Sequence, residues 1–275
     1  MKRVLFILVL LFLGILLYEL LKPFFPDPDP VEAVVPGGTP GELIIQSTFT
    51  PSFLILILCA ILLILLAFII YFRSPNLLLN KLFASAFFAF GLSSLSFSIT
   101  IFQWLYWTGE QIFIAFVFKL AYTFLFAGLV IVLFAALVLE FGSEATFTLL
   151  SLGLTTLITF GNFIILWFMP DSISVFAIPG HIYLSPLVKI VFFGSLAFFY
   201  LTTFVIFLKI YQAAEEAKKV SIKWMMMGWM ITGIALIFEA LREIQFFLIG
   251  NNTIGVVMMA FAGIIMQLGF KESEI

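Results

Sequence analysis

The chain has 275 residues, of which 64% are hydrophobic and only 10% are charged. Soluble domains carry about 25% charged residues, so the composition excludes a soluble globular protein. One cysteine and one histidine exclude an internal disulfide, a cysteine metal cluster and two-histidine haem ligation, and a net charge of −2 without a long basic run argues against nucleic-acid binding.

Apolar stretches of membrane length follow one another along the chain. A helix of about 20 apolar residues crosses a bilayer core of about 30 Å. Lipid offers no hydrogen bonds to an unpaired backbone, and the strict alternation of a membrane barrel is absent, so the stretches are predicted to be helices. The predicted fold class is all-α, a polytopic transmembrane helical bundle of about eight helices. The predicted helices are residues 4–21, 53–72, 82–106, 112–139, 147–169, 186–208, 224–246 and 254–270.

Three regions are predicted. Residues 1–22 form an N-terminal membrane anchor or signal segment, and the lack of a small-x-small cleavage pair favours an uncleaved anchor. Residues 23–52 are an external, acidic linker whose many prolines and glycines predict an extended chain, either a passive spacer or a ligand-binding loop. Residues 53–275 form a seven-helix membrane bundle.

The lysines and arginines outside the spans predict the orientation. With alternating spans and a cytoplasmic N-terminus, nine of them are cytoplasmic and only Lys22 is external, as the positive-inside rule favours. We therefore expect a multi-pass protein of the plasma membrane with both termini in the cytoplasm. The nine cytoplasmic residues are Lys2, Arg3, Arg73, Lys81, Lys209, Lys218, Lys219, Lys223 and Lys271.

Two connecting segments have distinct predictions. Residues 170–185 are expected to be an external loop that caps the bundle. Residues 209–223 are expected to continue the sixth helix into the cytoplasm, with Glu215 and Lys219 paired at i,i+4.

Ionisable residues inside apolar helices are the best candidate site, because they are costly in a membrane and are functional candidates by default. Three helices are predicted to bring five of them to one depth in the outer half of the membrane. They can serve as a snorkelling interface that fixes the bundle, as a ligand or signal pocket, or as part of a proton or ion path. The five residues of this candidate charge network are Lys119, Lys189, Glu239, Arg242 and Glu243.

Small residues predict where helices approach closely. Ser94 and Ser98 form a small-xxx-small pair, Gly228 begins such a surface in the seventh predicted helix, and Ala260 and Gly263 do so in the eighth. These positions predict packing rather than chemistry.

Catalytic and cofactor motifs are missing from the sequence. There is no Walker loop, GxSxG or HExxH motif. The methionines of WMMMGWM at residues 224–230 are interpreted as packing residues near an aromatic belt, not as metal ligands. We therefore predict no enzymatic activity, no catalytic residues, no cofactor and no metal.

Several local motifs resemble those of one group of signalling proteins. They are RSPNLLLNKLF between the first two of the seven helices, FAALVLEFG at the end of the fourth predicted helix and KWMMMGWMITG at the start of the seventh. Over residues 53–270 the chain resembles the seven-helix N-terminal membrane sensor region of microbial histidine kinases. The resemblance implies a sensor that starts outside the membrane. Because the chain ends at FKESEI without a kinase domain, it also implies an output delivered by another chain.

The sequence thus predicts an integral membrane sensor or interaction subunit that couples an external ligand or partner to a cytoplasmic partner protein. The expected partners are the lipid bilayer and a membrane or cytoplasmic protein, not a nucleic acid. The alternative is a small transporter or channel subunit, which needs polar residues through the full depth of the membrane. An enzyme acting on lipid is a third possibility.

Overall fold

The fold is known from a computed structural model, which describes residues 40–106, 111–146, 148–170, 172–175, 182–243 and 253–272. These residues form seven helices and one short hairpin of two strands. The helices are α2 (Pro40–Arg73), α3 (Leu78–Tyr106), α4 (Gln111–Thr146), α5 (Leu149–Phe168), α6 (Pro186–Ala213), α7 (Glu216–Glu243) and α8 (Thr253–Glu272). Between α5 and α6, β1 (Ile173–Val175) pairs antiparallel with β2 (Ile182–Leu184).

The predicted helical membrane fold is confirmed at this level. Five of the described helices, α2, α3, α4, α6 and α7, are long and apolar enough to cross a membrane. Helices α5 and α8 contain shorter apolar stretches, residues 152–168 and 255–269. The predicted first helix, residues 4–21, lies outside the described residues, so the count of eight stays a prediction.

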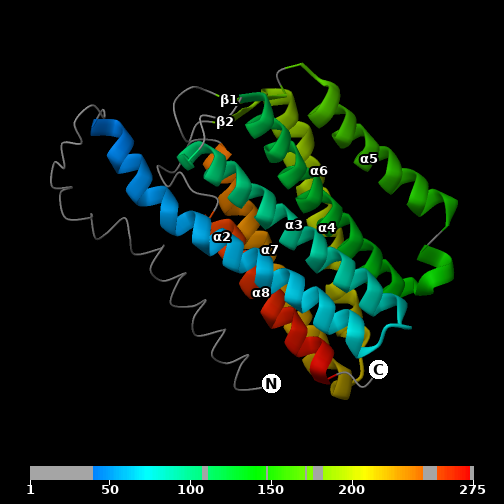
Figure 1. The fold of residues 1–275 in the computed structure, drawn as a ribbon. Coiled ribbons are helices and arrows are strands. Elements are labelled where there is room, and N and C mark those ends of the chain that lie inside the picture. The colour runs from blue at the N-terminus through cyan, green and yellow to red at the C-terminus, as the bar shows by residue number, and fades with distance from the viewer. Residues whose placement is uncertain are drawn as a thin grey trace.

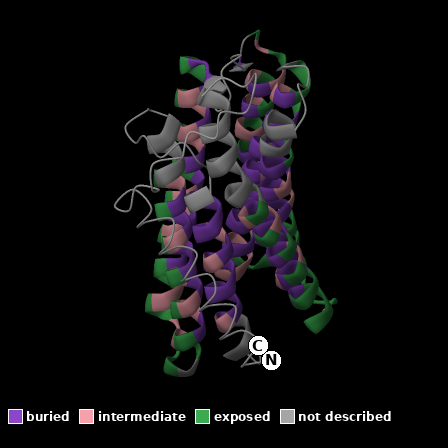
Figure 2. Ribbon diagram, turned by 60° about the vertical axis from the view of Figure 1, so that its left-hand side comes forward, coloured by how far each residue is buried: buried purple, intermediate pink, exposed green. Residues whose placement is uncertain are grey.

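The helices run alternately up and down between two ends of the bundle (Figure 1). The β1–β2 hairpin lies at one end, together with the start of α6. The turns at residues 74–77 and 214–215 lie at the other end, which we call the turn end. Buried residues fill the middle of the bundle and exposed residues line its outside (Figure 2), as expected of helices that turn one face to lipid.

Two sequence predictions about segment boundaries are wrong. Residues 40–52 were expected to belong to an extended linker, but they are helical and continuous with α2. Residues 209–223 do not continue a single helix, because α6 ends at Ala213 and α7 begins at Glu216.

The turn between α6 and α7 also changes the predicted ion pair. The Glu215 carbonyl accepts hydrogen bonds from the backbone N–H groups of Lys218 and Lys219, at 2.9 and 3.1 Å, so Glu215 precedes the helix instead of lying within it. Lys219 Nζ binds Glu216 Oε1 at 2.7 Å. The pair is therefore i,i+3 from the first residue of α7, not i,i+4 from Glu215.

The predicted loop at residues 170–185 contains the hairpin. Ser172 Oγ donates to the Leu166 carbonyl at 2.7 Å, and the Ser185 N–H donates to the Ser172 carbonyl at 3.0 Å. Ser185 then caps α6, because its hydroxyl accepts the Val188 N–H at 3.3 Å and Pro186 follows it at the first helical position. These bonds tie the end of α5 to the start of α6.

The predicted small-residue contacts are confirmed at Ser94, Gly228 and Gly263, while Ser98 Oγ donates to the Leu95 carbonyl of its own helix. Ser94 Oγ donates to the Leu56 carbonyl of α2 at 2.8 Å. A Cβ on Gly228 would lie 2.7 Å from the Ala262 carbonyl oxygen of α8, and a Cβ on Gly263 would meet Phe87, Leu63 and Leu66 at 3.0 to 3.4 Å. Small residues therefore let these helix backbones approach closely.

Candidate functional site

The five residues of the candidate charge network lie on three helices. Lys119 is on α4, Lys189 is in the first turn of α6, and Glu239, Arg242 and Glu243 are at the end of α7. The side chains of the three α7 residues lie outside the described residues. Their depth in the bundle follows from the backbone of α7.

Helices α4 and α6 place Lys119 and Lys189 at the same depth. The two helices run in the same direction, and the rings of Tyr122 and Phe192 meet with centroids 5.0 Å apart. Lys119 precedes Tyr122 by three residues, and Lys189 precedes Phe192 by three. Equal helical rise therefore puts both lysines about one turn above this contact.

Helices α6 and α7 run in opposite directions and bring the α7 charges to the same level. The rings of Tyr200 and Trp229 stack with centroids 5.3 Å apart. Lys189 lies 11 residues before Tyr200, which is about 16 Å along the helix axis. The same distance beyond Trp229 reaches Ala240, next to Glu239. All five residues thus share one level of the bundle, which we call the charge level.

The charge level lies one membrane thickness from the turn end. Lys189 and Lys209 are 20 residues apart on α6, and Lys119 and Glu140 are 21 apart on α4. At about 1.5 Å per residue these spacings are about 30 Å, which matches the thickness of a hydrocarbon core. The five residues therefore lie at the boundary of the apolar layer, not near its middle.

Lys119 faces a different neighbour from the α7 charges. Phe116, Lys119 and Thr123 form one stripe of α4 at i, i+3 and i+7. Trp167 of α5 contacts both ends of that stripe, with its ring 5.4 Å from Phe116 and its Nε1 donating to Thr123 Oγ1 at 3.0 Å. Lys119 is therefore on the α5 side of α4, and it makes no ion pair with any side chain that the structure describes.

Lys189 is the lysine that the fold brings near the α7 charges. Helix α6 packs against both α4 and α7, and it carries Lys189 at the level of Glu239 and Arg242. The predicted network is thus possible between α6 and α7, where the two helices are neighbours, while Lys119 lies on the side of α4 that faces α5.

An aromatic layer closes the bundle directly below the charge level. Tyr122 is fully buried, and its ring meets Phe97, Phe118 and Phe192 at centroid distances of 5.7, 4.9 and 5.0 Å, all edge-on. Edge-to-face aromatic pairs add stability beyond their buried area. The sequence signal was the high phenylalanine content, but the composition does not say which rings meet.

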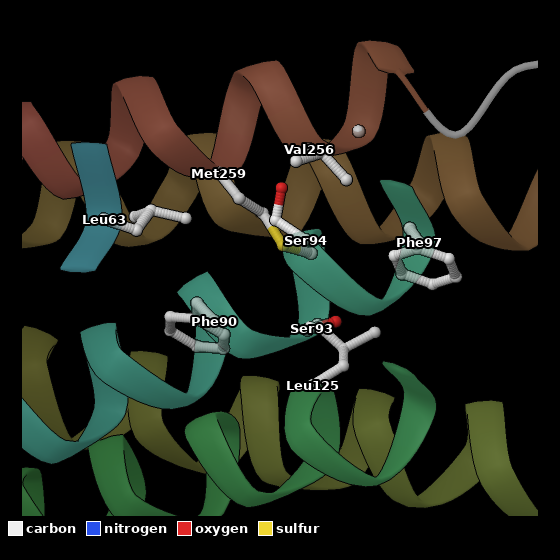
Figure 3. A pocket seen from close by; sticks show the side chains of 9 residues that line it. Leu63, Phe90, Ser93, Ser94, Phe97, Leu125, Val256 and Met259 are labelled. Atoms are coloured by element: carbon white, nitrogen blue, oxygen red, sulfur yellow. The ribbon is translucent and has the colours of Figure 1, made fainter. Parts of the chain in front are cut away.

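A small cavity lies between α2, α3, α4 and α8, and Phe97 of the aromatic layer is among its lining residues. Figure 3 shows Phe90, Ser93, Ser94 and Phe97 of α3 beside Met259 of α8. The space open to the centre of a water molecule is about 10 Å³, which is room for about one water.

The hydroxyl groups that line this cavity already have partners. Ser93 Oγ donates to the Ala121 carbonyl at 2.8 Å, and Ser94 Oγ donates to the Leu56 carbonyl at 2.8 Å. They join α3 to α4 and to α2. Their arrangement is that of interhelical hydrogen bonds in a membrane bundle and not of an open polar path.

Metal and cysteine chemistry finds no support in the described part of the chain. Within it, no three His, Cys, Asp or Glu residues lie close enough together to hold a metal ion. Cys59 is fully buried on α2, so its thiol has no access to solvent. His181, the one histidine, lies outside the described residues.

No family model, curated protein or solved structure matches this chain.

Proposed function

We propose that the protein is a non-enzymatic sensor or interaction subunit of the plasma membrane. It couples an external ligand or partner, bound near the charge level, to a protein partner on the cytoplasmic side. Both termini are cytoplasmic in this proposal, which makes the turn end cytoplasmic and the hairpin end external.

One observation carries the proposal: the charged residues gather at one boundary of the bundle, directly above the packed rings around Tyr122. A transporter or channel needs polar groups or space through the whole depth. The aromatic rings around Tyr122 and a cavity with room for about one water favour a protein that senses at one face and signals by a shift of helices.

The α6–α7 pair is the proposed route of the signal. Lys189 and the α7 charges stand at its external end, and the turn at Ala214 and Glu215 is at its cytoplasmic end. A ligand that pulls Lys189 towards or away from Glu239 would change how α6 sits against Trp229. Because both helices are continuous to the turn, that change would move Lys218 relative to Lys209.

The orientation is tested by cysteine labelling in a chain that carries Cys59→Ala. We expect a membrane-impermeant thiol reagent to label Gly38→Cys in intact cells and Glu216→Cys only after permeabilisation. The opposite pattern would place the charge level in the cytoplasm and end the proposal of an external ligand.

The coupling is tested by affinity purification from native membranes. We expect a co-purifying partner whose yield falls when Lys218, Lys219 and Lys223 are changed to Glu, with membrane insertion measured in the same sample because these charges also support orientation. Recovery of the protein alone, together with solute or ion flux in liposomes, would favour the alternative of a small transporter or channel subunit.

A further inference from the structure

Nine of the described helical glycines, leaving aside Gly142 at the α4 kink and Gly255, fall into two groups. A Cβ added to any member of the first group would meet another residue within 3.4 Å: Gly91, Gly128, Gly228, Gly233, Gly263 and Gly269. For Gly153 and Gly161 of α5 and Gly194 of α6, the same Cβ would meet nothing within 4 Å. Glycine is unfavourable inside a helix, and in membrane proteins it is typical of helix contacts. The second group has no such contact within the described chain.

The open glycines of α5 lie on its exposed face. Gly153, Leu157, Phe160, Gly161 and Ile164 share one side of the helix by the 3.6-residue period. Leu157 is 71% exposed and Phe160 is 59% exposed. The face therefore has two notches beside large apolar side chains, and α5 lies at the edge of the bundle (Figure 1).

A pair of exposed or partly exposed carboxylates precedes α5 at the turn end. Glu140 and Glu144 lie where α4 turns into α5, and Gly142 makes the turn with a φ of 80°. Neither carboxylate makes an ion pair or a hydrogen bond with a residue that the structure describes. The other described turns of this end carry lysine or arginine, at Arg73, Lys81, Lys209, Lys218 and Lys223, so the acidic turn before α5 is the exception.

The exposed apolar face of α5 and the two nearby carboxylates together favour one kind of binding partner. Transmembrane helices usually carry Lys or Arg at their cytoplasmic flank, and such a flank is complementary to Glu140 and Glu144. A second copy that packed α5 on α5 about an axis along the membrane normal would instead bring like charges together. The charge of the turn and the shape of the α5 face therefore both favour a helix from a different protein as the binding partner.

We propose that the exposed face of α5, with Glu140 and Glu144 preceding it at the turn end, binds a single transmembrane helix of another protein with Lys or Arg at its cytoplasmic flank. The apolar side chains of that helix fill the notches at Gly153 and Gly161. The inference rests on the proposed function, which requires a partner, and it names the kind of partner and the surface.

The first test uses a defined helix in phosphatidylcholine vesicles, which lack anionic lipid to compete for the basic flank. The protein carries Cys59→Ala and a donor dye on Ala145→Cys, an exposed position. The acceptor is on a synthetic helix of about 20 leucine and alanine residues with three lysines at one flank, and its matched control has three serines there.

We expect the lysine-flanked helix to associate at least about fivefold more strongly than the serine-flanked one. The double variant Glu140→Gln, Glu144→Gln should reduce that preference to below about twofold. The double variant Gly153→Leu, Gly161→Leu should weaken association of both helices. Ile61→Phe on the exposed face of α2 is the control and should change neither. Circular dichroism and a melting curve confirm that each variant is folded.

Three results would overturn the proposal in this assay. The first is equal association of the two synthetic helices. The second is an equal loss with Ile61→Phe. The third is strong energy transfer between labelled copies of the protein that the synthetic helix does not reduce, which would assign the α5 face to a second copy.

The second test uses native membranes, with a photo-crosslinking residue at position 157 of α5 or, as a control, at position 61 of α2. We expect an adduct at position 157 that mass spectrometry identifies as a membrane helix with a basic cytoplasmic flank, and that is lost in the Glu140→Gln, Glu144→Gln variant. Adducts with lipid only, or with a second copy, would overturn the proposal. Solute flux in liposomes would contradict the proposed function and leave this binding result intact, so the two failures are distinguishable.

Discussion

Helices α5 and α8 are both 20 residues long and both apolar, but they are packed in opposite ways. Most of α8 from Gly255 to Gly269 is buried between α7 and α2, while most of α5 is exposed at the edge of the bundle. The glycines of α8 touch neighbouring helices, and those of α5 touch nothing that the structure describes. Apolar composition therefore assigns a helix to the membrane without saying whether it faces protein or lipid.

The difference follows from what lies opposite each small residue. On α8, a Cβ at Gly269 would lie 2.5 Å from the Ser221 carbonyl oxygen of α7, so the two backbones are in direct contact. Helix α5 buries fewer side chains, with Leu166 in the core, and adds side-chain hydrogen bonds, including Asn162 Nδ2 to Ser195 Oγ at 2.8 Å. Two pairs of substitutions test this comparison between the tightly packed α7–α8 side and α5, and a third pair compares α5 with the α2–α3 contact.

The largest change in the free energy of unfolding is expected when a buried tryptophan is replaced by alanine. Trp229 of α7 is fully buried, stacks on Tyr200 and donates Nε1–H to the Tyr200 carbonyl at 3.2 Å. Trp229→Ala should lower the free energy of unfolding by about 3–5 kcal/mol. Trp167→Ala on the partly exposed surface of α5 should cost less than half as much. Denaturant titration in detergent measures both, and equal losses would contradict the comparison.

The second-largest effect on the free energy of unfolding should differ in sign between alanine substitutions at two glycines. A Cβ at Gly228 would lie 2.5 Å from Met266 Cγ and 2.7 Å from the Ala262 carbonyl oxygen. Because the carbonyl belongs to a helix backbone, Gly228→Ala must push α7 and α8 apart and should cost about 1–3 kcal/mol. Gly161→Ala meets nothing within 4 Å and should stabilise the purified protein by up to about 1 kcal/mol.

Melting curves of these two variants measure both effects, and they also test the contrast between α5 and α8. If Gly161→Ala destabilises the purified, monomeric protein as much as Gly228→Ala does, then α5 is packed against part of this chain that the structure does not describe. The contrast between the two helices would then be lost.

The smallest effect is expected from interhelical hydrogen bonds. Ser94 Oγ donates to Leu56 O between α3 and α2, and membrane hydrogen bonds of this kind contribute about 0.6 kcal/mol on average. Ser94→Ala should therefore cost about that much. Asn162→Leu should also cost little, because the change removes the Nδ2 bonds to the Ile158 carbonyl and to Ser195 Oγ but also removes Asn162 Oδ1, a buried acceptor without a partner among the described residues.

Thermal melting of both variants in one detergent measures this last pair. A loss above about 2 kcal/mol for Asn162→Leu would mean that the polar contact is a main attachment of α5, contrary to the comparison.

The sequence by itself determined the class of the protein and the position of most helices. Apolar runs of membrane length must form helices because lipid cannot pair their backbone groups, and five of them are confirmed as long enough to span a membrane. Among the basic residues expected at one end, those that the structure describes lie there in the fold, as at Arg73 and Lys209. The start of α2 was missed because prolines and glycines made residues 40–52 look extended.

Only the tertiary structure decided which helices are neighbours and which faces remain open. The sequence could place Lys119, Lys189 and Glu239 at one depth, because helical rise is fixed. It could not show that Lys119 faces α5 while Lys189 is beside α7, since the choice depends on how each helix is rotated about its axis. That rotation is set by which small residues allow close approach, as at Gly228 and Ala262, and by contacts between residues far apart in the chain.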